Sequence, residues 1–151
     1  MKHKKWTWGV LFLLSLLLLA ILFFVNWNTL LLFQMDNTFT SAINNNNDIA
    51  LIETQSVCGK LNGNGNGIQF FGAALITTQS KTDLDLLVQQ LSSKYDIVQY
   101  AVQTGSKIET TYLEHASLQF DSDASNIDGA YIVYYYNSTH YLSNDWDLVG
   151  H

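Results

Sequence analysis

The sequence predicts an α+β protein with one N-terminal transmembrane helix, followed by a small extracytoplasmic domain that has a mixed or antiparallel sheet and one main packed helix. Three observations predict this fold class. Residues 6–25 are apolar over a length that crosses a bilayer. Residues 82–95 repeat their apolar positions with the period of a helix. Residue types that favour strands fill 68–78, 97–104 and 130–136.

The first element is the uncharged segment 6–25, WTWGVLFLLSLLLLAILFFV. A helix of this length spans roughly 30 Å, the thickness of a bilayer's hydrocarbon core, and it satisfies its own backbone hydrogen bonds. Apolar residues continue as far as residue 33, so the end of the helix stays open between 25 and 33. The apolar run is longer than that of a signal peptide, and no small-x-small cleavage site follows it, which favours an uncleaved anchor.

The lysines predict the orientation of this anchor. Lys2, Lys4 and Lys5 precede it, and the next lysine in the chain is Lys60. Because positive flanks stay on the cytoplasmic side, we expect residues 1–5 to form a cytoplasmic basic tail. The sequence therefore predicts a cell-membrane protein whose C-terminal domain is extracytoplasmic.

The composition narrows the choice of partners. Beyond the anchor, four lysines stand against 13 acidic residues, a net charge of −9, and the chain has no arginine. Such a surface disfavours nucleic acid, which needs many basic contacts to phosphates, and favours cationic partners. The single cysteine, Cys58, cannot form an intramolecular disulfide, so core packing must hold the domain together.

Residues 34–48 are expected to link the anchor to a domain at 49–151, because the asparagine run at 44–47 favours turns. Residues 49–57 fit either a short helix or an extended segment. Residues 68–78 are apolar on both faces, which predicts a central strand.

The predicted helix 82–95 has one apolar face and an N-cap at Ser80 or Thr82. The face consists of Leu84, Leu87, Val88, Leu91 and Tyr95. With the strands on either side, it fits a β-α-β crossover if those strands are parallel.

The C-terminal half alternates between strands and loops. In the strand 97–104, Val98, Tyr100 and Val102 share one face. Residues 106–115 are ambiguous and could form a helix. Residues 116–120 alternate like a strand, 121–129 read as a polar loop, and 130–136 are strongly β-prone.

A glycine- and asparagine-rich loop is the most unusual local sequence. It consists of Asn62, Gly63, Asn64, Gly65, Asn66 and Gly67. Both residue types adopt positive φ readily, so the segment is a candidate ligand loop that could cradle an anion with backbone N–H groups. A tight structural turn is the alternative, because the loop leads into a strand and has no phosphate-binding motif.

Three aspartates resemble the start of a calcium loop, namely Asp121, Asp123 and Asp128. The sixth position of such a loop is Asn126 where glycine is needed, and the twelfth is Ile132 where a bidentate glutamate belongs. No histidine or cysteine pair has metal-binding spacing, so we expect no metal site and no cofactor.

The tyrosines of segment 130–136 are the best candidates for a partner surface. Alternation places Tyr131 and Tyr135 on one face and Tyr134 and Tyr136 on the other. We expect one pair to lie in the core and the other to be exposed.

No motif of a known catalytic site is present, so the sequence favours a noncatalytic binding or interaction domain held at the membrane. The alternatives are a cell-surface hydrolase that uses His115 with Glu109 or Glu114, and an accessory subunit of a membrane complex. The partner of the favoured module would be a protein or another cell-surface component.

Overall fold

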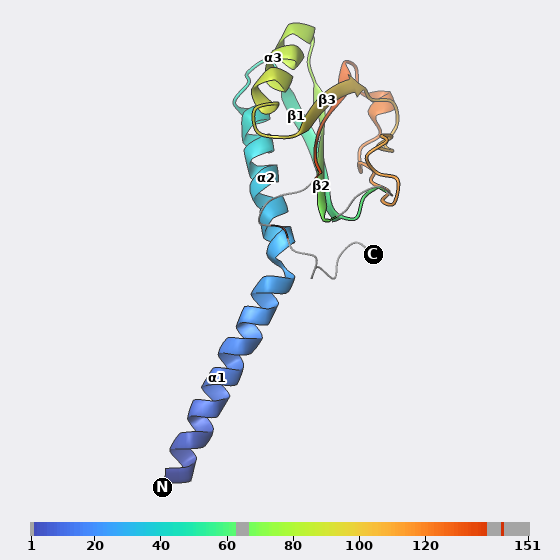
Figure 1. Ribbon diagram of the computed structural model, residues 1–151. Coiled ribbons are helices and arrows are strands. Elements are labelled where there is room, and N and C mark those ends of the chain that lie inside the picture. The colour runs from blue at the N-terminus through green and yellow to red at the C-terminus, as the bar shows by residue number, and fades with distance from the viewer. Residues whose placement is uncertain (1, 63–66, 139–142, 144–151) are drawn as a thin grey trace.

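The computed structural model describes residues 2–62, 67–138 and 143, and within them it has three α-helices and a four-stranded antiparallel sheet (Figure 1). The elements are α1 (Lys2–Val25), α2 (Trp27–Asn44), β1 (Ala50–Gly59), β2 (Gln69–Thr77), α3 (Lys81–Leu91), β3 (Ile97–Val102), a 3₁₀ turn (Ala124–Asn126) and β4 (Ala130–Asn137). The α+β class is therefore confirmed.

The sheet has the strand order β1-β2-β4-β3, with every neighbouring pair antiparallel. Strands β2 and β3 run in the same direction, as a β-α-β crossover requires. However, β4 lies between them, so β2, α3 and β3 form a split β-α-β unit and not a parallel pair.

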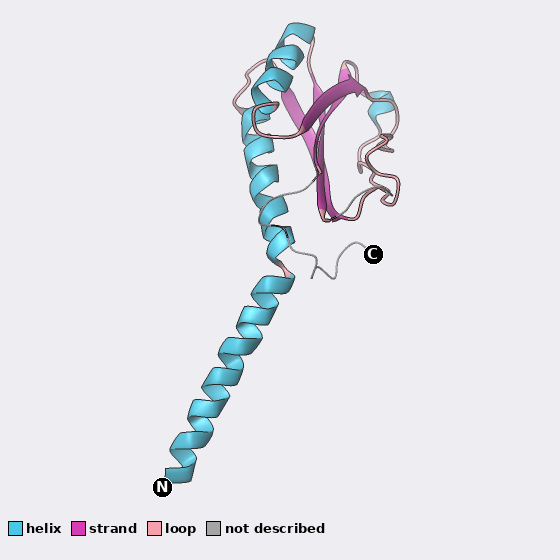
Figure 2. Ribbon diagram, in the orientation of Figure 1, coloured by secondary structure: helices cyan, strands magenta, loops and turns pink. Residues whose placement is uncertain are grey.

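The domain has three layers (Figure 2). Helices α2 and α3 cover one face of the sheet, and the irregular segment 103–129 covers the other. Because both faces are covered, the central strand β2 is buried over almost its whole length, as its apolar sequence predicts.

Helix α1 projects from this domain (Figure 1). Its segment Trp8–Val25 has a mean hydropathy of 2.9, and 0% of it is buried. It is long and apolar enough to cross a membrane, properties that an N-terminal signal sequence shares. The helix passes into α2 at Asn26, whose backbone N–H and side-chain amide both donate to the Leu22 carbonyl.

The linker expected at 34–48 is instead mostly helix. Helix α2 runs to Asn44, and its side chains Phe39, Ala42 and Ile43 are buried against the sheet. Apolar residues at helical spacing outweigh the polar residues between them, because burial on the sheet stabilises the helix more than local propensity opposes it. The turn that was expected from the asparagines begins only at residue 45.

The predicted α3 is confirmed. Ser80 is its N-cap, with Oγ accepting from the Asp83 N–H at 3.3 Å, and Leu84, Leu87 and Leu91 are buried. Tyr95 lies beyond the end of the helix but belongs to the same core. The undecided segment 49–57 forms most of β1.

In the C-terminal half, the strand expected at 116–120 is wrong, and the ambiguous segment 106–115 is irregular. Residues 106–115 form no helix and 116–120 form no strand, and the only pairing between them is an isolated bridge of Lys107 with Gln119. The apolar side chains of this segment, including Ile108, Leu113 and Phe120, are buried against the sheet. The segment therefore acts as a cover for the sheet, a role that does not require regular backbone hydrogen bonding.

Candidate functional site

The outer side of β3 forms an open edge of the sheet. The Gln103 N–H donates to the Ala130 carbonyl at 3.2 Å, which continues the β3–β4 ladder by one residue. Hydrogen-bonded positions alternate along an antiparallel ladder. Val98, Tyr100 and Val102 therefore point their backbone N–H and C=O groups away from β4. No strand within the described part of the chain pairs with that side.

A hollow of about 360 Å³ lies beside this edge. It is lined by Ala101, Val102, Gln103, Thr104, Lys107, Glu109, Ile132 and Tyr134. The end of β3, the loop after it and two β4 side chains thus form one concave surface, which we call the β3-edge groove.

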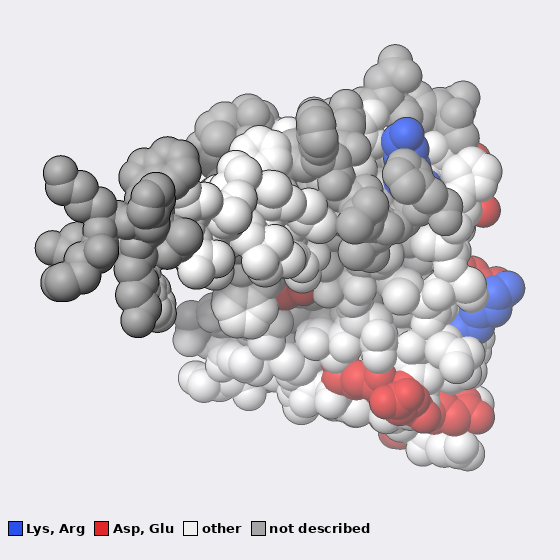
Figure 3. Space-filling view, turned by 90° about the horizontal axis from the view of Figure 1, so that it is seen from below, with Lys and Arg blue, Asp and Glu red and all other residues white. Residues whose placement is uncertain are grey.

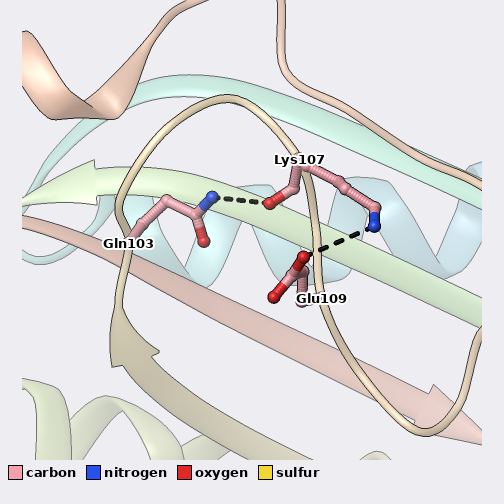
Figure 4. A network of polar contacts seen from close by, with 3 residues as sticks. All are labelled: Gln103, Lys107 and Glu109. Atoms are coloured by element: carbon pink, nitrogen blue, oxygen red, sulfur yellow. Dashed lines mark hydrogen bonds and ion pairs between the residues drawn. The ribbon is translucent and has the colours of Figure 1, made fainter.

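The loop that borders the groove is held by Gln103 (Figure 4). This side chain is 7% exposed, and its Nε2 donates to the carbonyls of Gly105, at 3.2 Å, and Lys107, at 2.9 Å. Gly105 has φ of 79°, which a glycine adopts without strain. Gln103 thereby fixes the backbone that positions the rim.

Two opposite charges lie on the rim. Lys107 Nζ and Glu109 Oε1 are 3.4 Å apart, and both side chains are largely exposed (Figure 4). An exposed pair of this kind adds little stability, so either group can exchange its partner for a ligand at little cost.

Tyr134 is the member of the predicted tyrosine surface that lines the groove. Its ring stacks on Phe71 with centroids 5.6 Å apart, and its hydroxyl donates to Gln99 Oε1 at 2.5 Å. Burial raises the pKa of Tyr134, so the hydroxyl stays protonated at neutral pH.

The four tyrosines do not divide by face into a buried pair and an exposed pair. Tyr135 and Tyr136 are buried on opposite faces, while Tyr131 and Tyr134 are half-buried. The expectation was wrong because both faces of the sheet are covered. Tyr135 stacks on Tyr95 on the helix side, and Tyr136 stacks on Tyr112 on the loop side.

Carboxylates surround the β3 edge. Asp85 Oδ1 accepts from the Tyr100 hydroxyl at 2.8 Å, and Asp96 Oδ2 accepts from the backbone and side chain of Ser138 at 2.9 Å. Asp85 and Glu109 thus lie beside the outer part of β3, while Asp96 lies at the start of β3 on its β4 side. Figure 3 shows that acidic side chains also gather in a strip on one face of the molecule, where basic side chains are fewer and separate.

The opposite edge, β1, is built differently. Its ladder shifts register between Leu51 and Glu53, and α2 packs on its helix-side face. Glu53 is half-buried, and its carboxylate accepts from the N–H groups of Asp121, at 2.8 Å, and Ser122, at 3.0 Å. Bulges, charges and covering elements are the usual protection of an edge strand.

Of the predicted ligand loop, residues 63–66 lie outside the described residues, and its two ends are held in place. Gln69 Oε1 accepts from the backbone N–H groups of Leu61 and Asn62, and Asn62 Nδ2 donates to the Tyr136 hydroxyl at 2.9 Å. At the other end, Gly67 has φ of 110°. These contacts fit a structural turn, and ligand binding by the loop stays a prediction.

Of the three calcium candidates, Asp123 holds a backbone group in the structure. Asp123 caps the 3₁₀ turn, with Oδ1 accepting from the Ser125 N–H and Oγ, while Asp121 and Asp128 are exposed. Among the described residues no group of three or more His, Cys, Asp or Glu side chains is placed to hold a metal ion.

The residues of the hydrolase alternative, His115, Glu109 and Glu114, are all exposed. The His115 backbone N–H donates to the Leu61 carbonyl at 3.0 Å, which places this residue beside the base of the glycine-rich loop. Glu109 faces Lys107 on the groove rim. The cell-surface hydrolase, the alternative to a binding domain, stays a prediction.

The β3 edge was not identified as a site from the sequence. The strand IVQYAV has no charge, proline or glycine. Whether such a strand is central or at an edge depends on the strand order, which the sequence does not show. No protein-family model, curated protein or solved structure matches the chain.

Proposed function

We propose that this protein is a single-pass membrane protein that presents a small acidic, noncatalytic binding domain outside the cytoplasm. The observation that carries the proposal is the junction of α1 and α2. The segment Trp8–Val25 of α1 is apolar and has no buried residue, and at Asn26 it joins directly to α2, one face of which is buried in the domain core.

The anchor supports membrane attachment for a physical reason. A fully exposed apolar helix is unfavourable in water, whereas lipid accommodates its side chains. Because α2 contributes Phe39 and Ile43 to the core, the domain is held close to the membrane and has no long flexible tether. A domain mounted in this way suits capture of a partner near the membrane surface.

The β3-edge groove is the surface that we assign to binding. It combines backbone groups that no strand of the described residues pairs with, an aromatic floor at Tyr134 and exchangeable charges at Lys107 and Glu109. The four tyrosines thus contribute to binding chiefly through Tyr134.

The test is the topology of the full chain in cells. A reporter fused after His151 should be active outside the cytoplasm, and protease added to intact, wall-stripped cells should remove the domain and leave the anchor. Mass spectrometry of the membrane fraction should find residues 1–25 still attached to the domain. A protected C-terminus, or a mature chain that begins after residue 25, would overturn the proposal.

A further inference from the structure

We propose that the β3 edge binds an extended, positively charged segment of a partner protein, which adds to the sheet as a new strand. This inference rests on the proposed function, because it names the kind of partner that the binding domain takes. It concerns the strand β3, the β3-edge groove and the carboxylates around them.

The backbone of β3 supplies the primary contact. Val98, Tyr100 and Val102 each direct one N–H and one C=O away from β4, as the bond from Gln103 to Ala130 requires. An added strand satisfies such groups with main-chain hydrogen bonds that do not depend on the partner's sequence. Val98 is only 8% exposed, so the accessible template is the second half of β3, with the outward groups of Tyr100 and Val102.

This edge lacks the protection found at the other one. The β3–β4 register has no shift, and IVQYAV contains no charged residue and no proline. Val102 is 67% exposed at its end. An uncharged edge with a regular register pairs readily with another strand. On β1, by contrast, a register shift and Glu53 interrupt the edge, and α2 packs on its face.

The surroundings of β3 provide sites for alternate side chains of an added strand. Side chains on the loop side would enter the β3-edge groove over Tyr134 and Ile132. Those on the helix side would pass Tyr100 and Val102 and approach the Asp85 carboxylate, which Tyr100 holds at 2.8 Å. Pockets on alternate positions are what give strand addition its specificity.

Charge decides between a partner and a second copy of this chain. Asp85 contacts Tyr100 of β3 and Glu109 lines the β3-edge groove beside Lys107, and the chain beyond the anchor carries four lysines against 13 acidic residues. Two copies that met at β3 would bring these carboxylates together and repel each other. A lysine- or arginine-rich segment would instead be attracted.

The experiment uses the full chain in nanodiscs of uncharged lipid and two fluorescent seven-residue peptides, one alternating Lys and Val and one alternating Glu and Val. We expect fluorescence anisotropy to show binding of the Lys–Val peptide only. Hydrogen exchange should show new protection at the amides of Tyr100 and Val102. Binding of both peptides alike, binding of neither, or protection elsewhere would overturn the proposal.

Two variants of one exposed position test the edge itself. Val102→Pro removes an outward N–H and leaves the β4 ladder intact, and Val102→Lys places a repelling charge on the edge. We expect both to weaken peptide binding by about tenfold or more, with unchanged thermal unfolding. Leu86→Lys on α3, where the leucine is 56% exposed, is the matched control and should bind like the unmodified chain. Equal binding by the two Val102 variants and the control would contradict the proposal.

Two further measurements test whether the β3 edge binds the protein's own C-terminal residues or a second copy of the chain instead of a partner. A chain ending at Ser138 that binds the peptide when the full chain does not would assign the edge to the protein's own C-terminal residues. A dimer in nanodiscs that Val102→Lys dissociates would assign it to a second copy. Either result overturns the partner proposal and leaves the membrane-anchored topology, which is tested separately, unaffected.

Discussion

At the scale of single residues, a polar cluster joins α2 to the sheet. Asp36 of α2 accepts hydrogen bonds from Ser56 Oγ and from the Tyr135 hydroxyl, the latter at 2.7 Å. Tyr135 stacks on Tyr95 with ring centroids 4.3 Å apart. Burial raises the pKa of Asp36, although both hydrogen bonds act against this shift. The cluster therefore fixes the position of α2 by hydrogen bonds that require a closely packed site.

Gly72 makes room for this cluster. It pairs with Tyr135 across β2 and β4, and a Cβ at residue 72 would overlap the Tyr135 ring and lie 2.9 Å from Asp36 Oδ1. We expect Gly72→Ala to destabilise the domain by about 1–3 kcal/mol, as overpacking of a core does. Urea unfolding of the full chain in detergent measures this. Gly9→Ala is the control, because a Cβ at residue 9 would have no atom within 4 Å apart from its chain neighbours and its own helix backbone. Equal stability of both variants would contradict the packing described.

The hydrogen bonds of Glu53 make the stability of the folded domain depend on pH. Burial raises the pKa of Glu53, but the hydrogen bonds it accepts from Gln55 and from the N–H groups of Asp121 and Ser122 outweigh burial and lower it. A carboxylate whose pKa is lower in the folded state stabilises that state above its ordinary pKa of 4.5. This contribution is lost as the pH falls through the folded-state pKa.

Glu53→Gln should therefore lower the melting temperature at pH 7, and the difference from the unmodified chain should shrink below pH 4.5. Thermal unfolding followed by circular dichroism across this range measures it. A difference that stays constant with pH would show that the charge of Glu53 is not the cause.

At the scale of elements, the two helices that cover the sheet use one apolar stripe each. In α3 the stripe consists of Leu84, Leu87 and Leu91, all fully buried, while Leu86 of the same helix faces solvent. In α2, Phe39 and Ile43 contact the same core. The turn after α3 is also joined to α2, because the Tyr95 hydroxyl donates to the Met35 carbonyl at 2.7 Å. Both helices therefore depend on packing more than on their own propensity.

Truncation of the α3 stripe should be costly. We expect Leu87→Ala or Leu91→Ala to lower the free energy of unfolding by about 2–5 kcal/mol, because each leaves a cavity in the core. Leu86→Ala should change it by less than about 0.5 kcal/mol, the usual range for an exposed position. Urea unfolding compares the three, and similar effects of Leu86→Ala and Leu87→Ala would contradict the assigned face.

Removal of α2 should unfold the domain. A fragment of residues 45–151 lacks Phe39, Ala42 and Ile43 and would expose their partners in the core, whereas a fragment of residues 27–151 keeps them. We expect the longer fragment to show dispersed amide resonances in nuclear magnetic resonance spectra and the shorter one to aggregate or lose them. A folded 45–151 fragment would show that α2 is only attached to the domain and not part of it.

At the scale of the whole molecule, charge is divided between the two ends of the anchor. Three lysines lie within residues 2–5, and all 13 acidic residues follow α1 in the chain. Short basic flanks favour the cytoplasmic side, and acidic residues contribute little to orientation. The lysines therefore set the proposed topology, while the acidic domain sets the charge of the partner.

Replacement of Lys2, Lys4 and Lys5 by glutamate should weaken this orientation. We expect a fraction of the chains to become protected from external protease, because the difference in positive charge across the membrane is removed. Lys60→Glu, beyond the anchor, is the matched control and should leave the topology unchanged. An unchanged topology in the triple variant would show that another feature orients the anchor.

The elements that could be predicted are those whose pattern is local. Each of three patterns predicts one type of element. The 20 uncharged residues predict a membrane-spanning helix, the leucine spacing predicts α3, and the β-branched and aromatic residues predict β4. The hydrogen bond from Asp83 to Ser80 likewise follows from residues three apart. The α+β class, the apolar N-terminal helix, α3 and the central β2 were determined by the sequence itself, because the spacing of apolar residues that predicts them is local.

Tertiary structure decided the rest. The Asn- and Thr-containing segment of α2 is helical because Phe39 and Ile43 pack on the sheet. Residues 106–120 cover the second face of the sheet with buried apolar side chains, which needs no regular backbone. The sequence also did not show that β4 would lie between β2 and β3, which leaves β3 at the edge with three residues facing outward. Strand order depends on contacts between distant residues, and the candidate binding edge exists only through that order.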